Sequence, residues 1–273
     1  MSYITLDDPI MMQAAVEEAG SFFKNTPPPV FVDEIQYAPN LFPYVKMIID
    51  GEKKKGQFYF SGSQQFHMMK NVSESLAGRI GIANMLGLSL REMKGVAFRG
   101  SFIPTEEYFA ERRQNLVPSG YREIWEIIHR GSMPELTADE NISRHSFYAA
   151  YARTYVERDV RDLAQVGDAV AFMKFMAVIA SMTGNLLNLS SVARDVGISA
   201  PTAERGLSVL AASDIVYLLR PYSNNAVKRA VKTPKIYFLD TGLAAYLTKW
   251  TSPEVMEAEP AAGHNAKSQL CKS

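Results

Sequence analysis

Apolar and polar positions in the first 60 residues alternate between strand-like and helix-like spacing. Residues 3–6 are a short β-prone run that ends before a proline, residues 10–24 have helical spacing, and residues 30–35 are a second apolar run. Residues 41–50 predict an amphipathic helix, and residues 57–60 a third strand. This order predicts a parallel sheet buried on both faces, with ligands at the carboxyl ends of its strands.

The pattern beyond residue 60 predicts one more strand and then a mainly helical region. Residues 80–90 read as a strand that leads out of the sheet, and residues 98–162 are helical in pattern, with breaks at prolines and glycines. Residues 169–182 are apolar nearly all round, which is typical of an interior helix. The fold class is therefore α/β in the first part of the chain and helical afterwards.

A further pattern follows that helix. Residues 190–196 predict a short helix, residues 197–199 a tight turn, and Pro201 the first turn of a second helix. Residues 215–219 and 235–239 are then predicted to pair as strands. The order helix, turn, helix and paired strands predicts a winged helix-turn-helix domain.

Composition and charge limit the class of protein and its compartment but identify no binding partner. The 273 residues are 47% hydrophobic and 21% charged, as in an ordinary globular protein, and 29 basic side chains balance 29 acidic ones. No global field therefore draws the chain to nucleic acid or to an anionic membrane. The single cysteine, Cys271, excludes an internal disulfide framework, and no leader or bilayer span is evident, so we expect a cytoplasmic protein without a membrane partner.

Polar side chains follow two strands that are predicted to be neighbours. Asp33 and Glu34 end the second strand, and Ser61 and Ser63 end the third. Paired acids at such a strand end suit the binding of a hydrated Mg²⁺ beside nucleotide phosphates and the polarisation of an attacking water. Carboxylates also occur at the ends of many strands and helices where they only cap the element or face solvent. The pair alone therefore fits both a nucleotide site and a solvated or capping role.

Longer motifs favour the nucleotide interpretation. The sequence resembles the AAA+-like bacterial and archaeal ATPases that carry a C-terminal domain of unknown function. The resemblance covers most of the chain from residue 3 to about 255 and rests on YITLDDP, PPVFVDEIQYAPNLFPYVKMIID, GQFYFSGSQQFHMMKNVSESLAGRI, GSMPE, FYAAYARTYVERDVRDL and PKIYFLDTGLAAYL.

The resemblance implies a site for ATP and Mg²⁺. Asp33, which would hold the metal, and Glu34, which would position the water, correspond to a Walker B motif. Either Ser61 or Ser63 would be the polar sensor of the γ-phosphate. Arg79 would be a charge-stabilising arginine, acting in cis or from a neighbouring subunit.

Arg158 is a second candidate for the charge-stabilising role. It lies between Glu157 and Asp159, so an ordinary surface ion pair on a helix is the competing interpretation. The four histidines are far apart and have no metal-ligand spacing. We therefore expect no metal beyond the Mg²⁺ held with nucleotide.

The phosphate-binding loop GxxxxGK[ST] is absent from the printed sequence. In the family this loop follows the first strand, which is central in the order 5-1-4-3-2 and lies between the strands that resemble residues 57–60 and 80–86. Each unpaired buried backbone group costs about 1–3 kcal/mol. We therefore expect an unstable chain unless self-association or another segment fills the slot, and we interpret the chain as a truncated gene product or a shortened regulator.

The resulting domain interpretation has four parts. Residues 1–97 would be an incomplete P-loop NTPase (AAA+) core, residues 98–162 a helical lid, residues 163–250 the winged helix, and residues 251–273 an irregular tail. The leading hypothesis is a truncated ATPase that couples nucleotide state to the winged helix and binds ATP weakly or not at all by itself.

Two other functions compete with the ATPase. A winged helix could bind DNA through Arg205 on its second helix and through the wing, which would contribute Lys228, Arg229 and Lys232. Residues 215–239 contain no acidic side chain, so the wing is locally positive. An interaction protein is the third hypothesis, because aromatic residues recur at helical spacing; such a stripe usually belongs to a core. Its members are Phe147, Tyr148, Tyr151 and Tyr155.

Overall fold

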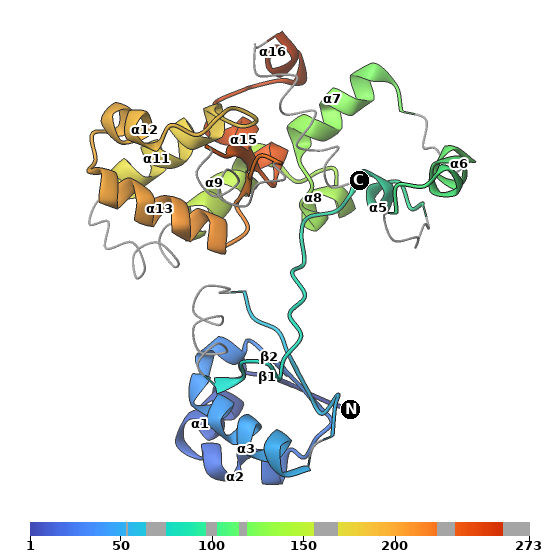
Figure 1. The fold of residues 1–273 in the computed structure, drawn as a ribbon, viewed down its shortest axis with the longest axis vertical. Coiled ribbons are helices and arrows are strands. Elements are labelled where there is room, and N and C mark those ends of the chain that lie inside the picture. Colours follow the sequence, from blue (N-terminus) through green and yellow to red (C-terminus); the bar gives the residue numbers. More distant parts are fainter. Residues whose placement is uncertain are drawn as a thin grey trace. The chain divides into compact units, whose positions relative to one another are not determined.

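The computed structural model describes residues 1–52, 54–63, 75–96, 103–114, 119–155, 169–222 and 233–258. The chain divides into two compact units, Met1–Asn84 and Met85–Ser273, and each is described by itself (Figure 1). None of the helices within the described ranges is both long enough and apolar enough to cross a bilayer.

The first unit contains a parallel sheet. Strands β1 (Ser2–Thr5), β2 (Val30–Asp33) and β3 (Phe58–Phe60) are ordered β1-β2-β3 among the described residues. Tyr3 lies opposite Phe31, and Phe31 opposite Tyr59. The three predicted strands and their parallel direction are confirmed.

The helices of this unit bury one face of the sheet. Helices α1 (Pro9–Glu17), α2 (Ala19–Asn25) and α3 (Phe42–Glu52) lie on the same side of the strands, and two short 3-10 turns, Ile35–Tyr37 and Pro39–Leu41, precede α3 (Figure 1). Their apolar side chains meet those of alternate strand residues in one core. It includes Ile4, Phe22, Phe23, Val30, Val32, Phe42 and Val45.

The opposite face of the sheet carries a row of aromatic side chains. Tyr3, Phe31 and Tyr59 are neighbours across the three strands, and Tyr3 stacks on Phe31 with ring centroids 5.7 Å apart. Tyr3 is 64% exposed and Tyr59 46%. The expectation of a sheet buried on both faces was therefore wrong for the described residues, because α1, α2 and α3 all pack against the same face.

The predicted strand at residues 80–90 is also wrong. Residues 80–88 have no regular secondary structure, and Ile82 and Met85 are 53% and 93% exposed. The last residue of this segment, Leu90, is the first residue of helix α5 (Leu90–Met93), and Ser89 is the N-cap of α5 in a capping box. An apolar run becomes a strand only when its backbone finds a neighbouring strand, and no described strand lies beside this one.

The second unit is mainly helical. Among the described residues its elements are α5 (Leu90–Met93), α6 (Glu106–Gln114), α7 (Tyr121–Arg130), α8 (Pro134–Ala138), α9 (Arg144–Tyr155), α11 (Ala169–Ser181), α12 (Leu189–Val196), α13 (Ala200–Ala212), β4 (Val216–Leu219), β5 (Lys235–Phe238), α15 (Thr241–Leu247) and α16 (Pro253–Ala258). A core of aromatic and aliphatic side chains joins α9, α11, α12, α13, α15 and the β4–β5 pair, and it includes the predicted interior helix α11.

Helices α12 and α13 are joined by the predicted turn. Gly197 has φ of 87°, a left-handed conformation that favours glycine, and Ser199 caps α13 by accepting the N–H of Thr202. Strands β4 and β5 then pair antiparallel, with Val216 opposite Phe238. Helix, turn, helix and paired strands are thus present as predicted; the segment between the two strands lies outside the described residues.

The carboxylate of Asp240, which is only 7% exposed, connects three segments that are far apart in the sequence. They contain Ser132, Tyr148 and Asp240 itself. One oxygen accepts hydrogen bonds from the backbone N–H and the hydroxyl of Ser132, at 2.7 and 2.8 Å. The other accepts from the Tyr148 hydroxyl and the Leu243 N–H, both at 2.7 Å. Burial raises the pKa of Tyr148, and the nearby Asp240 carboxylate adds to the effect, so this phenol remains a donor.

Gly242 lies close to the same cluster and leads to a stability prediction. A Cβ at Gly242 would lie 2.6 Å from the carbonyl oxygen of Arg130 and would also meet the Tyr148 hydroxyl. We expect Gly242→Ala to lower the free energy of unfolding by about 2–3 kcal/mol, because backbone and a buried ring must shift. Urea unfolding of the full chain measures this.

Gly120 provides the matched control, because a Cβ there meets no atom within 4 Å. Gly120→Ala should change the stability of the chain by less than about 1 kcal/mol. Equal stability of the Gly242→Ala and Gly120→Ala chains would contradict the packing described around Asp240.

Candidate functional site

Asp33 lies at the carboxyl end of the central described strand, between hydroxyl groups from both neighbouring strands. The Tyr3 hydroxyl of β1 donates to Oδ2 of Asp33 at 2.8 Å. The Ser61 hydroxyl, just after β3, donates to Oδ1 of Asp33. The parallel register produces this arrangement. Tyr3 lies opposite Phe31, two residues before Asp33, so the side chains of Tyr3 and Asp33 point to the same face of the sheet. Ser61 follows Phe60, which lies opposite Val32, so Ser61 lies beside Asp33.

These contacts favour the ionised form of Asp33. The hydrogen bond from Ser61 lowers the pKa of Asp33 most, followed by the hydrogen bond from Tyr3; the backbone N–H of Glu34 contributes in the same direction, and partial burial opposes them. The same carboxylate raises the pKa of the Tyr3 phenol. Asp33 is therefore a carboxylate, and Tyr3 its donor, at neutral pH.

Glu34 turns away from the strand and is held by two polar neighbours. Its backbone has φ of 56° and ψ of 41°, a left-handed conformation that is uncommon for a residue other than glycine. Oε2 of Glu34 accepts from Nε2 of Gln36, and from the Ser63 hydroxyl at 3.3 Å. The structure thus places Asp33, Glu34, Ser61 and Ser63 at the same edge of the sheet.

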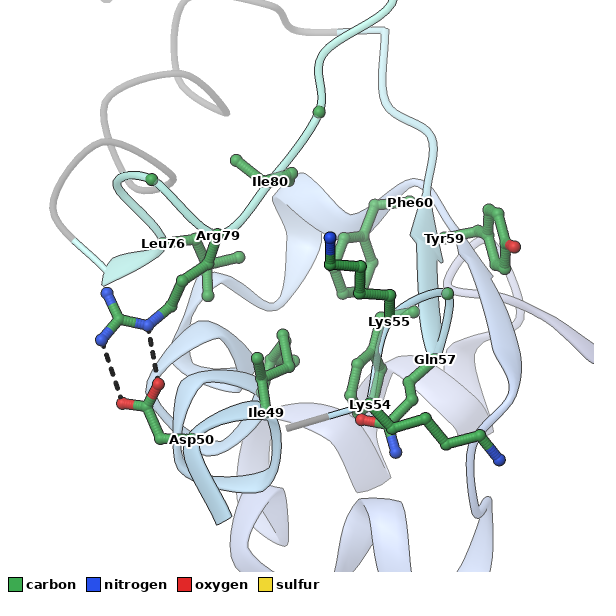
Figure 2. Close-up of a pocket in the computed structure, with 15 residues that line it drawn as sticks. Ile49, Asp50, Lys54, Lys55, Gln57, Tyr59, Phe60, Leu76, Arg79 and Ile80 are labelled. Atoms are coloured by element: carbon green, nitrogen blue, oxygen red, sulfur yellow. Dashed lines mark hydrogen bonds and ion pairs between the residues drawn. The ribbon is translucent and has the colours of Figure 1, made fainter. Parts of the chain in front are cut away.

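Arg79 does not join these acids. Its guanidinium donates to both carboxylate oxygens of Asp50, at 2.7 and 3.2 Å (Figure 2). Asp50 lies near the end of α3, and the next residues lead to the amino end of β3, where Glu52 contacts Gln57. Arg79 is therefore held at the edge of the sheet opposite to Asp33, and a role in charge stabilisation stays a prediction.

The remaining predicted residues divide between the second unit and the undescribed segments. Arg205 lies on the exposed face of α13, next to the exposed Glu204. Arg158, Lys228, Arg229 and Lys232 lie outside the described residues. Of the aromatic stripe, Tyr148 and Tyr155 are buried and Phe147 and Tyr151 pack against the same core, which confirms its interpretation as core.

Two residues at the acidic edge were missed by the sequence analysis. Tyr3 was interpreted only as part of a strand, and Gln36 was given no role. Gln36 bridges Glu34 and the Ser63 hydroxyl, the latter at 3.5 Å. The signal that could have found Tyr3 is its position two residues from the end of a strand parallel to the strand of Asp33.

The donor set at this edge suits a hard cation. It consists of oxygen atoms only, from an ionised carboxylate and nearby hydroxyl groups, and Mg²⁺ typically takes one or two carboxylates together with phosphate oxygens and water. A carboxylate has about four lone-pair sites, so the two hydroxyl donors leave acceptor capacity on Asp33. Within the described ranges, no group of three or more His, Cys, Asp or Glu side chains could hold a metal ion.

Comparison with known proteins finds a matching family model for each of two parts of the chain. Residues 1–94 match the model of an AAA domain, and residues 121–254 match a domain of unknown function (DUF8612). The chain has the domain order of AAA-like ATPases with a C-terminal domain of unknown function. Asp33 and Ser61 both lie within the residues that match the AAA domain.

Two curated relatives match across both domains. An uncharacterized protein of Mycobacterium tuberculosis and one of Mycobacterium bovis are each 28% identical to the chain over 234 residues. The aligned region covers 86% of this chain and 47% of each relative, so the chain spans about half the length of the curated relatives that it matches. No solved structure matches the chain.

The contacts of Asp33 predict a specific titration behaviour. Ser61→Ala should raise the pKa of Asp33 toward its ordinary value, and Tyr3→Phe should raise it less, because the Ser61 hydrogen bond has the larger effect. Carboxyl ¹³C NMR across a pH series measures both shifts. Since the folded pKa is depressed, the stability that depends on ionised Asp33 is present above about pH 4 and is lost as pH falls through the folded pKa.

Ser63→Ala is the control for this titration, since the Ser63 hydroxyl contacts Glu34 and not Asp33. It should leave the pKa of Asp33 unchanged. An Asp33 pKa that is the same in the Ser61→Ala chain as in the parent would refute the contact between the two strand ends.

Proposed function

We propose that the acidic edge of the first unit is the magnesium-nucleotide site of an AAA-type ATPase. The observation that carries the proposal is the position of an ionised Asp33 beside Ser61, with Glu34 and Ser63 adjacent, at the carboxyl ends of parallel strands. This is the edge at which such sheets bind ligands. The match of residues 1–94 to an AAA domain supports the same class of protein.

The residues of this edge have separate roles in the proposal. Asp33 would hold Mg²⁺, and Ser61 and Tyr3 keep its carboxylate ionised and oriented. Glu34 would accept a hydrogen bond from a water aligned with the γ-phosphate, while Gln36 and Ser63 fix its side chain. Ser63 or Ser61 would contact the γ-phosphate. Bound Mg²⁺ would supply charge neutralisation for the phosphate oxygens.

A phosphate-binding loop is the part that the printed residues do not supply. Such a loop provides backbone amides and a lysine for the β- and γ-phosphates, and the sequence contains no GxxxxGK[ST]. The acids can hold a cation, but without the cradle they have little attraction for the nucleotide itself. ATP binding therefore depends on a segment that brings the loop to this edge.

The chain as printed should bind Mg-ATP no more tightly than about 1 mM, a binding free energy of about −4 kcal/mol. A chain extended at its amino terminus by a strand, a GxxxxGKT loop and a helix should bind at least about 100-fold more tightly, because the cradle adds its amide and lysine contacts. Isothermal titration calorimetry with and without Mg²⁺ measures both affinities.

Asp33→Asn in the extended chain should remove the magnesium dependence of binding. Asp195→Asn, at an exposed ion pair on α12, should have no effect. Failure of the extended chain to bind Mg-ATP would contradict the nucleotide site. Micromolar binding by the unextended chain would contradict the need for the loop.

A second candidate function is DNA binding by the second unit as a winged helix. The favouring observation is α13, which follows a tight turn after α12 and precedes the antiparallel β4–β5 pair. Its exposed face carries Arg205, Glu204 and Ser208, so the helix offers one cation to phosphate or base edges. Most of the positive charge belongs to the segment between β4 and β5, with Lys228, Arg229 and Lys232.

A gel shift with duplex DNA at increasing salt tests this second function. Lys228→Glu combined with Arg229→Glu should abolish the shift, because two phosphate contacts are replaced by repulsion. Lys249→Glu, which lies after α15, is the matched control and should leave the shift unchanged. A shift that survives the double substitution would exclude the wing as the DNA contact.

A further inference from the structure

The strand pair of the second unit has one buried face and one exposed face. Val216 of β4 lies opposite Phe238 of β5, and both side chains are buried in the core. Successive residues of a strand point to opposite faces, and residues directly opposite each other in a pair point to the same face. The residues of the other face are Tyr217 and Leu219 of β4 and Lys235 and Tyr237 of β5.

Two tyrosines are neighbours on this exposed face. Tyr217 is directly opposite Tyr237; Tyr217 is 54% exposed, and Tyr237 is partly exposed. Side chains directly opposite each other in an antiparallel pair have Cβ atoms about 4.5–5.5 Å apart. The strand pair therefore presents two adjacent aromatic side chains to solvent.

A lysine lies between two leucines in the next row of the same face. Lys235 is directly opposite Leu219, and on its other side it pairs with Leu186 in an isolated antiparallel bridge. Leu186 and Leu219 are 61% and 43% exposed, and Lys235 is exposed as well. We call this patch the tyrosine face. It consists of Leu186, Tyr217, Leu219, Lys235 and Tyr237.

The segments that form the tyrosine face carry positive charge and no negative charge. Residues 183–194, which include Leu186, and residues 215–239, which include both strands, contain no Asp or Glu. Arg220 directly follows β4 and is exposed, so it adds a second cation to Lys235. An anion that approaches the two tyrosines would therefore meet no carboxylate from either segment.

These features favour nucleic acid over protein as the partner. Tyrosine suits both, but lysine is depleted from the cores of protein interfaces, because a buried charge without a partner is costly. A phosphate group would pair with Lys235. A duplex keeps its bases stacked inside, whereas the bases of a single strand can splay out and stack on the aromatic side chains of a sheet. Single-stranded nucleic acid therefore fits this face best.

We propose that the tyrosine face binds single-stranded nucleic acid, with one base stacked on Tyr217, a neighbouring base on Tyr237, and phosphates at Lys235 and Arg220. Every base has an aromatic face, so we expect little sequence preference. The surface differs from the duplex contact considered above, and the proposal does not depend on the magnesium-nucleotide site. Its test contains no ATP and no Mg²⁺, so the two can fail separately.

Fluorescein-labelled strands of oligodeoxythymidine and oligouridine, each about 20 nucleotides long, probe the full chain by fluorescence anisotropy. We expect saturable binding of at least one strand, weaker at higher salt because phosphate contacts release counterions. Tyr217→Ala and Tyr237→Ala should each weaken binding at least about fivefold. Tyr217→Phe keeps the ring and should bind within about twofold of the parent chain. Comparison of the two strands shows whether DNA or RNA is preferred.

Two matched controls separate the tyrosine face from the rest of the surface. Tyr121→Ala removes a tyrosine that is 67% exposed but lies on α7, and it should bind as the parent chain does. Lys235→Glu should weaken binding at least about fivefold, while Lys249→Glu, after α15, makes the same charge change and should have little effect. Lys235 is exposed, so its variant tests the face even where a tyrosine variant fails to fold.

Several results would overturn the proposal. One is the absence of saturable binding of both strands, and another is equal binding by the Lys235→Glu chain and the parent. Tighter binding of a duplex of the same length would contradict stacking of splayed bases. A dimer that is lost with Tyr217→Ala or Lys235→Glu would assign the tyrosine face to a second copy of the chain.

Discussion

The parallel register of β1, β2 and β3 determines which side chains can act together in the first unit. With Phe31 opposite Tyr3 and Tyr59, the residue two positions later, Asp33, must lie between Thr5 and Ser61 at the carboxyl edge. A shift of one residue would move Asp33 to the helix-covered face. The buried Val30 and Val32 exclude such a shift, so burial of an apolar core also fixes the polar edge.

The edge of the sheet at β3 has no neighbouring strand among the described residues. Backbone N–H and C=O groups of a strand need a neighbouring strand or water as a partner. Residues 80–84 are irregular, and an apolar groove lies beside β3.

The second unit depends on a different interaction, the buried carboxylate of Asp240. Its four hydrogen bonds connect the residues after α7, helix α9 and the start of α15. Removing one donor would leave a buried charge incompletely hydrogen-bonded, which costs more than the bond itself contributes. The motifs containing Ser132, Tyr148 and Asp240 thus have a structural role in this unit.

Much of the fold could be predicted from the sequence, because local apolar spacing specifies strands and helices. Residues 3–6, 30–35 and 57–60 and the helix-turn-helix order were found this way. Residues 80–90 were predicted wrongly, since a strand also needs a partner that local spacing does not reveal.

Contacts between distant residues were harder to predict for the same reason. The hydrogen bond from Tyr3 to Asp33 and the ion pair of Arg79 with Asp50 each join residues about 30 positions apart. Their existence depends on packing and register, and no local signal distinguishes Arg79 at Asp50 from Arg79 near Asp33. The pair of acids itself was recognisable because it ends an apolar run.

Amide hydrogen exchange along β3 tests the central claim most directly, because it reports which backbone groups are hydrogen-bonded. With the chain alone, the account predicts that the Tyr59 amide, which faces β2, exchanges slowly, while the amides of Phe58 and Phe60 exchange much faster. Equal protection of all three amides would contradict an open edge at β3.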